Sequence, residues 1–382
     1  MTLPENVNYI LDTLVSHGYS AYLVGGCVRD MLMKKAPHDY DITTNAMPDE
    51  TEALFSDHTL ILSGKKHGTV AVCVSGEVIE ITTYRIDGTY ADNRHPMQVS
   101  FTDRIEEDLA RRDFTMNAIA MSKDGMLTDP FGGGRDIERG IIRCVGTPTE
   151  RFGEDALRIM RAVRFSSVTG FSIEDSTGAA VHSCRELLRN ISAERILSEL
   201  IKTLNGKNAG VVMKQYRDVF SVVLPCCEDI EKVGMLPVDT AIRLAYMLKA
   251  ASDPLDALGY LRVSNALRDE VLSILANYGD VPADMPHLRL FVGKYGADIA
   301  KKCCILAQLC HATDMSGTLH NINEITENKL PCRISDLAIN GDDLKKLGMR
   351  GKEIGDRLND LLLLVVSGKA ENSRSALSEL LR

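Results

Sequence analysis

The chain has 382 residues, 45% of them hydrophobic and 25% charged, which is typical of a globular protein with two or three structural units. Its formal net charge of −9 excludes a protein held on nucleic acid by bulk positive charge, so a nucleic-acid partner would need locally placed basic groups. The longest apolar run covers residues 361–366, far short of the ~20 that cross a bilayer. The amino terminus lacks a basic start and an apolar signal core, so we expect a cytoplasmic protein with no membrane partner.

The ten cysteines form no Cys-x-x-Cys pair, and two pairs of them are directly adjacent in the sequence. This spacing suits neither a zinc site nor a disulfide framework, so reduced and mostly buried thiols are expected. Tryptophan is absent and aromatic residues make up 5% of the chain, which argues against a broad aromatic platform for single-stranded RNA.

Short β-like runs alternate with helical segments over residues 1–145, which predicts a mixed α/β head with a small sheet. A strand ending in a glycine turn leads into a helix, and two later runs around Ser75-Gly76 are typical of a hairpin. The expected strands are 21–26, 38–44, 69–74, 77–83, 116–121 and 141–145, and the first helix begins within 28–33.

After about residue 150, leucine, isoleucine, methionine and alanine recur at three- and four-residue spacing, which predicts an all-helical remainder. The fold class is therefore α+β, with a head (1–145), a helical neck (146–210), a helical body (211–328) and a helical tail (329–382). The tail has ten Lys or Arg against eight Asp or Glu, so it is slightly basic in an acidic chain. The expected helices include 154–166, 193–204, 240–251, 265–276 and 297–311.

Gly25 and Gly26 stand between the first strand and the first helix, and Arg29 follows one turn later. Residues without a Cβ let the backbone approach a bulky anion, and a helix N-terminus offers free N–H groups and partial positive charge. A guanidinium nearby suits phosphate oxygens. The pattern predicts a phosphate cradle, although a strand–Gly-Gly–helix segment taken alone is more typical of a plain tight turn.

Asp39 and Asp41 are separated by one residue in a run expected to be a strand, so their side chains should share a face. Two carboxylates on one face repel each other unless a cation lies between them, and Mg²⁺ binds a few carboxylates together with phosphate oxygens. Glu80, on an expected neighbouring strand, is a third candidate: it either joins this catalytic cluster or orients a basic neighbour such as Arg85. The sequence thus predicts catalysis by Asp39, Asp41 and Glu80, with Mg²⁺ on the two aspartates.

Five ordered blocks carry a resemblance to a known family. GGCVRD and HDYDIT resemble the polymerase-β-like nucleotidyltransferases, and three later blocks resemble the class II tRNA nucleotidyltransferases, that is the CCA-adding enzymes and the related bacterial poly(A) polymerases. These later blocks are RRDFTMNA (111–118), DPFGG (129–133) and EDALRIMRAVRF (154–165). The likeness is dense over residues 20–165 and extends thinly through ISAERI (191–196) to the tail.

The resemblance implies a nucleotide site in which Arg112 contacts the triphosphate, while Asp113 and Asn117 shape the sugar pocket. Asp155 and Arg158, three residues apart on an expected helix, would offer one acceptor and one forked donor. That pair fits the Watson–Crick edges of cytosine and adenine and leaves uracil and guanine with unpaired polar groups. Spacing alone favours a solvated ion pair, and the full set of blocks favours the base-reading role. Arg161 and Arg164, further along the same helix, would reach phosphates or the pocket wall.

Residues 84–96 are rich in Gly, Asp, Asn and Pro, which predicts a loop. The segment resembles the flexible loop that CCA-adding members use when they switch from C to A. His95 stands where a basic residue is usual in the family.

The resemblance implies template-independent addition of CCA to the 3′ end of tRNA, with CTP and ATP as substrates and release of pyrophosphate. Two alternatives share this chemistry, an A-adding tRNA nucleotidyltransferase and a poly(A) polymerase, although the acidic charge and the absence of a basic carboxyl-terminal extension disfavour the polymerase. A non-catalytic tRNA-binding protein is a third alternative, and the presence of both Asp39 and Asp41 argues against it. The sequence predicts no oligomeric state.

Overall fold

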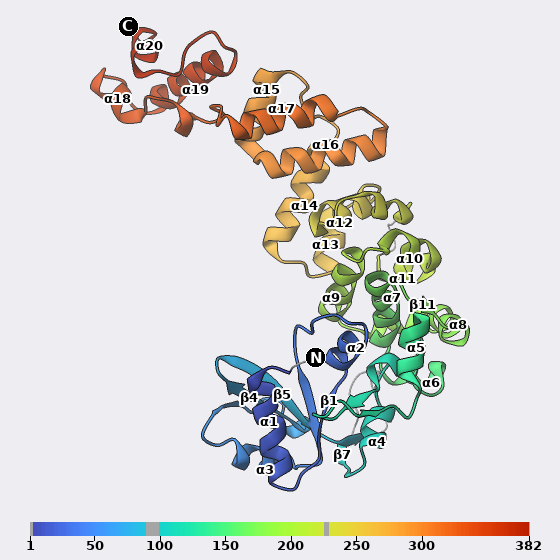
Figure 1. Ribbon diagram of the computed structural model, residues 1–382. Helices are drawn as coiled ribbons and strands as arrows, with labels where there is room; N and C mark the ends of the chain where they lie inside the picture. Colours follow the sequence, from blue (N-terminus) through green and yellow to red (C-terminus); the bar gives the residue numbers. More distant parts are fainter. Residues whose placement is uncertain (1–2, 89–98, 225–228, 382) are drawn as a thin grey trace. The chain divides into compact units, whose positions relative to one another are not determined.

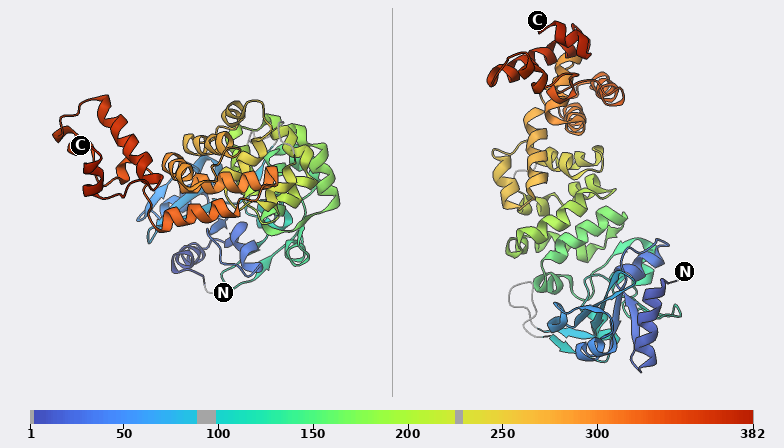
Figure 2. Two further views of the ribbon diagram at one scale, coloured as in Figure 1. Left: turned by 90° about the horizontal axis from the view of Figure 1, so that it is seen from above. Right: turned by 90° about the vertical axis from the view of Figure 1, so that its left-hand side faces the viewer.

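The computed structural model describes residues 3–88, 99–224 and 229–381, and the chain divides into two compact units, Met1–Pro225 and Cys226–Arg382 (Figure 1). Every described strand lies in the first unit, and the described part of the second unit is built from helices (Figure 2). The expected α+β class is therefore confirmed. The division into head, neck, body and tail at 145, 210 and 328 stays a prediction.

A seven-stranded mixed sheet forms the centre of the first unit, with the strand order β3-β4-β5-β2-β1-β8-β9. All neighbours in it are antiparallel except β2 and β5, which run parallel. The strands are β1 (Ala21–Val24), β2 (Asp41–Thr44), β3 (Thr59–Ile61), β4 (Thr69–Val74), β5 (Glu77–Thr83), β8 (Ala120–Met121) and β9 (Leu127–Thr128).

The hairpin expected around Ser75-Gly76 is confirmed as β4 and β5, which pair from Thr69↔Thr82 to Val74↔Glu77. Ser75 and Gly76 have φ angles of 54° and 84°, and two consecutive positive φ angles give the type I′ turn whose twist matches that of the flanking strands. Helix α1 (Glu5–Ser16) packs against β1 through a buried stripe that includes Ile10 and Leu14 (Figure 2).

Four expected strands are shorter than predicted. The runs 21–26 and 141–145 form strands only over Ala21–Val24 and Ile141–Ile142. The run 38–44 becomes a strand only at Asp41, because the ladder with β1 ends at Val24↔Asp41 and the ladder with β5 ends at Asp41↔Glu80. Asp39 therefore lies in a bend before β2, and the prediction that it stands on the strand is wrong. The run 116–121 begins as a 3₁₀ turn, η2 (Thr115–Asn117), and only its last two residues form β8.

The helix expected over 154–166 is in fact two helices with a break between them. Helix α6 (Pro148–Glu154) ends at Glu154, and helix α7 (Leu157–Thr169) begins at Leu157. Asp155 lies between them with extended dihedral angles (φ −134°, ψ 101°), and its Oδ1 accepts a hydrogen bond from the N–H of Leu157 at 3.1 Å. Asp155 is thus not on the helix that carries Arg158, because its side chain competes with the helical backbone for this N–H.

The other elements of the first unit are α2 (Gly26–Leu32), α3 (Pro48–Leu54), η1 (Lys65–His67), β6 (Arg85–Asp87), β7 (Val99–Phe101), α4 (Ile105–Ala110), α5 (Gly133–Arg139), β10 (Ile141–Ile142), β11 (Ser172–Ile173), α8 (Asp175–Ser183), η3 (Arg185–Asn190), α9 (Ala193–Leu204), α10 (Ala209–Gln215) and α11 (Arg217–Val223). β10 pairs with β11, so the segment predicted as an all-helical neck contains one short strand. β6 pairs with β7, so the predicted loop 84–96 begins with a strand; His95 lies outside the described residues.

The second unit consists of η4 (Ile230–Met235), α12 (Thr240–Leu248), α13 (Pro254–Tyr260), α14 (Asn265–Asn277), α15 (Met285–Tyr295), α16 (Ala297–His311), α17 (Ser316–Glu327), η5 (Ile334–Asp336), α18 (Gly341–Lys346), α19 (Lys352–Val366) and α20 (Arg374–Glu379). The eight cysteines that the structure describes are free thiols, as expected. Among the described residues, no helix combines the length and the apolar character that crossing a bilayer requires.

Candidate active site

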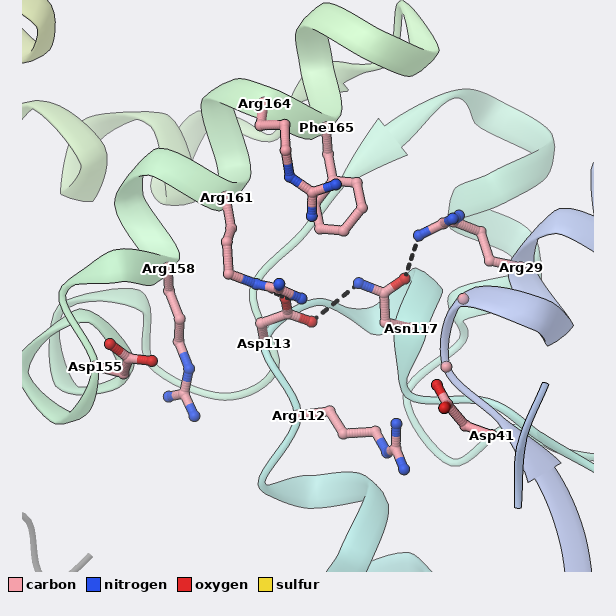
Figure 3. Close-up of a pocket in the computed structure, with 12 residues that line it drawn as sticks. Arg29, Asp41, Arg112, Asp113, Asn117, Asp155, Arg158, Arg161, Arg164 and Phe165 are labelled. Carbon is pink, nitrogen blue, oxygen red and sulfur yellow. Dashed lines mark hydrogen bonds and ion pairs between the residues drawn. The ribbon is translucent and has the colours of Figure 1, made fainter. Parts of the chain in front are cut away.

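A cavity of about 390 Å³ in the first unit collects most of the residues that the sequence singled out. Ten of the twelve predicted site residues line it, and Asp39 and Glu80 do not. Five arginines and three aspartates surround the space, so its walls favour a polyanionic ligand (Figure 3). The lining consists of Gly25, Gly26, Arg29, Asp41, Arg112, Asp113, Asn117, Asp155, Arg158, Arg161, Arg164 and Phe165.

Gly25 forms the turn between β1 and α2 at φ 75° and ψ −130°, a conformation that residues with a Cβ rarely adopt. A Cβ at this position would lie 3.1 Å from Nη1 of Arg112 and 3.7 Å from Oδ2 of Asp41. The absence of a side chain therefore lets a guanidinium and a carboxylate approach the backbone together. Gly26 begins α2 at the cavity wall, as the phosphate-cradle prediction requires.

Four cavity side chains form a continuous chain of hydrogen bonds across the floor of the site (Figure 3). Arg29 donates to Oδ1 of Asn117 at 3.0 Å, and Nδ2 of Asn117 donates to Oδ1 of Asp113 at 3.0 Å. Nε of Arg161 donates to Oδ2 of Asp113 at 2.7 Å. The chain links helix α2, turn η2 and helix α7, so the predicted phosphate-binding and sugar-binding residues hold one another in place.

Asp113 is the electrostatic centre of this chain. Burial by itself would raise its pKa, but the charge of Arg161 and the hydrogen bonds from Asn117, Arg161 and the N–H of Phe114 lower it to about 2. Asp113 is therefore an ionised acceptor at neutral pH, and it holds the two donors that face the cavity.

Arg112 points into the cavity toward Asp41 (Figure 3). Its Nη2 lies 3.3 Å from the fully buried carboxylate of Asp108, which also accepts from Arg111. Burial would raise the pKa of Asp108, but these two guanidinium groups lower it. Nε of Arg112 is buried and has no hydrogen-bond partner among the described residues. A buried donor without a partner beside a cavity suits a phosphate oxygen.

Phe165, the last residue of the EDALRIMRAVRF block, lines the cavity, and the sequence alone predicts no role for it. Its ring lies under the guanidinium of Arg164, with 3.9 Å between the Cζ atom and the ring centroid. The guanidinium groups of Arg29 and Arg161 lie 5.2 and 5.4 Å from the same centroid. The face of an aromatic ring attracts cations, so Phe165 helps to keep three mutually repelling arginines together. Its signal in the sequence was its position directly after Arg164.

Asp41 and Glu80 are register partners on the parallel strands β2 and β5. Desolvation by the surrounding protein raises the pKa of Asp41, and the charges of Glu80 and Asp39 raise it further, while Arg112 opposes them. Carboxylates that repel in this way fit a divalent cation. Among the described residues, however, no three His, Cys, Asp or Glu side chains form a preassembled metal site. Further ligands would have to come from phosphate oxygens and water, as is usual for Mg²⁺.

Asp155 and Arg158 both line the cavity, and both side chains are held in place by residues outside its lining. Arg158 is 7% exposed, and it donates to the carbonyl oxygens of Arg151 (3.0 Å) and Arg111 (3.1 Å) and to the carboxylate of Glu154 (2.7 Å). Oδ2 of Asp155 accepts a hydrogen bond from Nη2 of Arg195, on helix α9, at 3.0 Å.

The DPFGG block has a structural explanation. Asp129 accepts hydrogen bonds from the N–H groups of Gly133 (2.7 Å) and Gly134 (2.9 Å) at the start of α5. A Cβ on Gly133 would lie 2.0 Å from the carbonyl oxygen of Thr115, so only glycine lets α5 pack against η2. Since η2 carries Asn117, this block supports the floor of the cavity.

Comparison with known proteins agrees with this geometry. Three family models match: "Poly A polymerase head domain" over residues 21–143, "Probable RNA and SrmB- binding site of polymerase A" over 170–226, and "tRNA nucleotidyltransferase domain 2 putative" over 240–381. The CCA-adding enzyme of Lactobacillus delbrueckii subsp. bulgaricus is 37% identical over 97% of this chain and 96% of its own length. That of Geobacillus kaustophilus is 38% identical over 96% and 93%.

This chain belongs to the CCA-adding enzyme family. A crystal structure of the Bacillus stearothermophilus CCA-adding enzyme in complex with CTP has 32% sequence identity and a TM-score of 0.83, covering 99% of this chain and 96% of the other. The resemblance inferred from the five motif blocks is therefore confirmed, and the architecture of head sheet followed by helices is that of the family. The family relationship makes the chain a nucleotidyltransferase.

Proposed function

We propose that this chain adds CCA to the 3′ end of tRNA without a nucleic-acid template, using CTP twice and then ATP. The observation that carries the proposal is the single cavity in which ten of the predicted site residues meet, in a chain that matches CCA-adding enzymes along nearly its whole length. A tRNA substrate and free thiols are consistent with a cytoplasmic protein.

In each step the 3′-hydroxyl oxygen of the RNA forms a bond to the α-phosphorus of the nucleotide. The bond from this phosphorus to the bridging oxygen breaks, pyrophosphate leaves, and the hydroxyl proton passes to solvent. We propose that Arg29, Arg112 and the backbone at Gly26 hold the triphosphate, where positive charge offsets the charge that accumulates on the leaving group. Asp113 and Asn117 would form the sugar pocket, with Arg161 and Arg164 completing the cationic wall.

Asp39 and Asp41 would hold Mg²⁺, with Glu80 beside them. The repulsion between the Asp41 and Glu80 carboxylates across the β2–β5 ladder supports this assignment, and the exposed position of Asp39 in the preceding bend leaves it free to approach a cation. A divalent cation bound there lowers the pKa of an attacking hydroxyl and neutralises charge on a departing pyrophosphate.

Asp155 and Arg158 would select the base. A carboxylate accepts the amino group of cytosine or adenine, and a guanidinium donates to the ring nitrogen beside that amino group. Uracil and guanine present a carbonyl oxygen and a ring N–H at these positions, so they leave buried polar groups unpaired, which a site built for hydrogen bonding rejects strongly.

Incubation of the protein with tRNA that lacks its last three nucleotides tests the proposal. CTP alone should add two nucleotides, CTP with ATP should add three, and ATP alone should add one nucleotide only to tRNA that already ends in CC. Addition of a single A to tRNA that ends in CC, with no incorporation of CTP into tRNA lacking all three nucleotides, would indicate an A-adding enzyme. Long runs of A would indicate a poly(A) polymerase, and absence of incorporation into either tRNA would indicate a non-catalytic tRNA-binding protein.

A further inference from the structure

Helix α9 carries two charged side chains, four residues apart, that contact cavity residues from outside the cavity. Nη2 of Arg195 lies 3.0 Å from Oδ2 of Asp155, and Oε2 of Glu199 lies 2.5 Å from Nε of Arg164. Residues four apart share one face of a helix. Neither Arg195 nor Glu199 lines the cavity, and none of the motif roles described above includes them.

Helix α9 is firmly placed in the first unit. Its apolar stripe, which includes Ile196 and Leu200, is buried, and the helix packs against α7, which carries Arg158 and Arg164. Oγ of Ser167 on α7 donates to the carbonyl oxygen of Thr203 at 2.7 Å and ties the end of α9 to α7. Side chains on this face of α9 therefore have a fixed position relative to the cavity.

The position of the Asp155 carboxylate depends on helix α9 more than the positions of the other cavity side chains do. It lies in the break between α6 and α7, so no helical turn determines where its side chain points. Two hydrogen bonds fix its carboxylate: Oδ1 accepts from the N–H of Leu157 at 3.1 Å, and Oδ2 accepts from Arg195. The first of these is local and constrains only one oxygen, so the contact with Arg195 sets the plane of the carboxylate.

We propose that Arg195 is a positioning residue for base selection, which fixes the carboxylate of Asp155 so that its free lone pairs face the amino group of an incoming cytosine or adenine. The inference rests on the proposed function. A carboxylate can only accept hydrogen bonds, so it can distinguish the amino group of one base from the carbonyl group of another. It does so only while it stays fixed at the position that the edge of the bound base occupies. Without the contact to Arg195, the carboxylate of Asp155 would be able to turn away from the carbonyl oxygen of uracil, and discrimination against UTP would weaken.

Stability alone does not explain an arginine at this position. Nη1 of Arg195 is buried and has no hydrogen-bond partner within the described part of the chain. A buried donor without a partner costs about 1–3 kcal/mol. The contact of Nη2 with Asp155 offsets part of this cost, so the guanidinium at this position depends on its contact with Asp155.

The test compares Arg195→Met with Arg189→Met, a control at an exposed arginine of the same unit that pairs only with Glu186 among the ion pairs described. The substrate is tRNA lacking its last three nucleotides, and the readout is the ratio of kcat/KM for CTP to kcat/KM for UTP. We expect Arg195→Met to lower this ratio at least ~10-fold, because a displacement of about 1 Å in a positioned group costs up to ~10²-fold. Arg189→Met should leave it unchanged.

Two further variants keep the result interpretable. Arg195→Lys retains the charge and should restore part of the CTP-to-UTP ratio of kcat/KM, which a merely structural role would not require. If Arg195→Met fails to fold, Arg195→Lys serves as the test variant instead. Glu199→Gln, on the same helix, should raise KM for CTP and UTP alike and leave their ratio unchanged. An unchanged ratio in both Arg195 variants would overturn the inference while the proposed function stands. Absence of incorporation by the unmodified chain would instead overturn the proposed function.

Discussion

Asp41 and Glu80 lie directly opposite each other at the point where strands β2 and β5 run parallel, in a sheet whose other neighbours are antiparallel. Both side chains therefore lie on the same face of the sheet, and Asp41 lies beside the turn at Gly25. Arg112 approaches Asp41 from the other side of the cavity (Figure 3). The carboxylate of Asp41, which suits a cation, and the guanidinium of Arg112, which suits a polyphosphate, therefore lie side by side in the cavity.

Replacement of Asp41 should abolish nucleotide addition without preventing tRNA binding. Asp41→Asn keeps the shape but removes the charge that would hold a cation, and loss of several kcal/mol of transition-state stabilisation corresponds to ~10³-fold or more in rate. Incorporation of labelled CMP and a gel-shift assay measure the two properties. Asp57→Asn, at an exposed carboxylate of the same unit, is the matched control and should remain active. Unchanged turnover by Asp41→Asn would remove the metal assignment.

Removal of divalent cations should have the same effect as loss of Asp41. Treatment with EDTA should stop incorporation, and added Mg²⁺ should restore it. If Glu80 contributes to the site, Glu80→Gln should raise the Mg²⁺ concentration that gives half-maximal activity, because one of the carboxylates that repels Asp41 is then neutral. An unaltered Mg²⁺ dependence in this variant would leave Asp39 and Asp41 as the proposed ligands without Glu80.

Gly25→Ala should impair the enzyme far more than an alanine elsewhere. The added Cβ would crowd Arg112 and Asp41 in a backbone conformation that costs of order 1–3 kcal/mol for a residue other than glycine. We expect a raised KM for CTP and a lowered kcat together. Gly259→Ala is the matched control: this helical glycine in α13 has open space around it, and alanine there should be neutral or stabilising by up to about 1 kcal/mol. Equal behaviour of the two variants would contradict the role of the turn.

Much of the site could be predicted because its chemistry is local in the sequence. The Gly-Gly turn, the RRD block and the arginines after Asp155 each occupy one short segment, and ten of the twelve predicted residues meet in one cavity. The hairpin at Ser75-Gly76 and the helix Ala193–Leu204 were predicted with the correct bounds, since turn chemistry and a continuous apolar stripe determine them.

The wrong predictions for Asp39 and Asp155 arise from interactions that a local pattern does not contain. One is the pairing of strands that are distant in sequence, and the other is a side chain that hydrogen-bonds a backbone N–H in place of the helix. Asp39 was assigned to a strand, but the strand begins only where β1 and β5 offer partners, at Asp41. Asp155 was assigned to a helix because the apolar period continues across it, yet its own carboxylate takes the N–H of Leu157 and interrupts the helix. The contact with Arg195 joins segments 40 residues apart in sequence, and no local pattern reveals it.

The buried ion pair between Asp113 and Arg161 should make the first unit sensitive to acid. The pKa of Asp113 is lowered to about 2, so its stabilising contribution is fully present above its ordinary value of 3.8 and is lost as the pH falls through about 2. This depression corresponds to about 2 kcal/mol at pH 7, of which roughly half should be gone at pH 3. Asp113→Asn should therefore lower the free energy of unfolding by urea at pH 7, and its difference from the unmodified chain should shrink toward pH 3. A difference independent of pH would contradict the assignment.

Lys302 should stabilise the second unit because its charge attracts three carboxylates that would otherwise repel one another. Its Nζ lies 2.9, 2.5 and 2.8 Å from carboxylates of Asp239, Glu270 and Asp298, and its side chain is 13% exposed. Desolvation would lower the pKa of Lys302, but the hydrogen bonds that its ammonium group donates to the three carboxylates raise it, so the lysine stays charged at neutral pH. Lys302→Met removes the only cation among these contacts and leaves three carboxylates that repel one another.

We expect Lys302→Met to lower the free energy of unfolding by about 2 kcal/mol or more, since hydrogen bonds to charged groups contribute about 1.5–3 kcal/mol each. The loss should be smaller in 1 M NaCl, where the Debye length falls to about 3 Å and the repulsion is screened. Urea unfolding at low and high salt measures both effects. Lys345→Met, at an exposed lysine of the same unit that pairs with Asp342, is the control and should change stability by less than about 1 kcal/mol. A loss in Lys302→Met that is independent of salt would mean that packing of the alkyl chain, rather than charge, explains it.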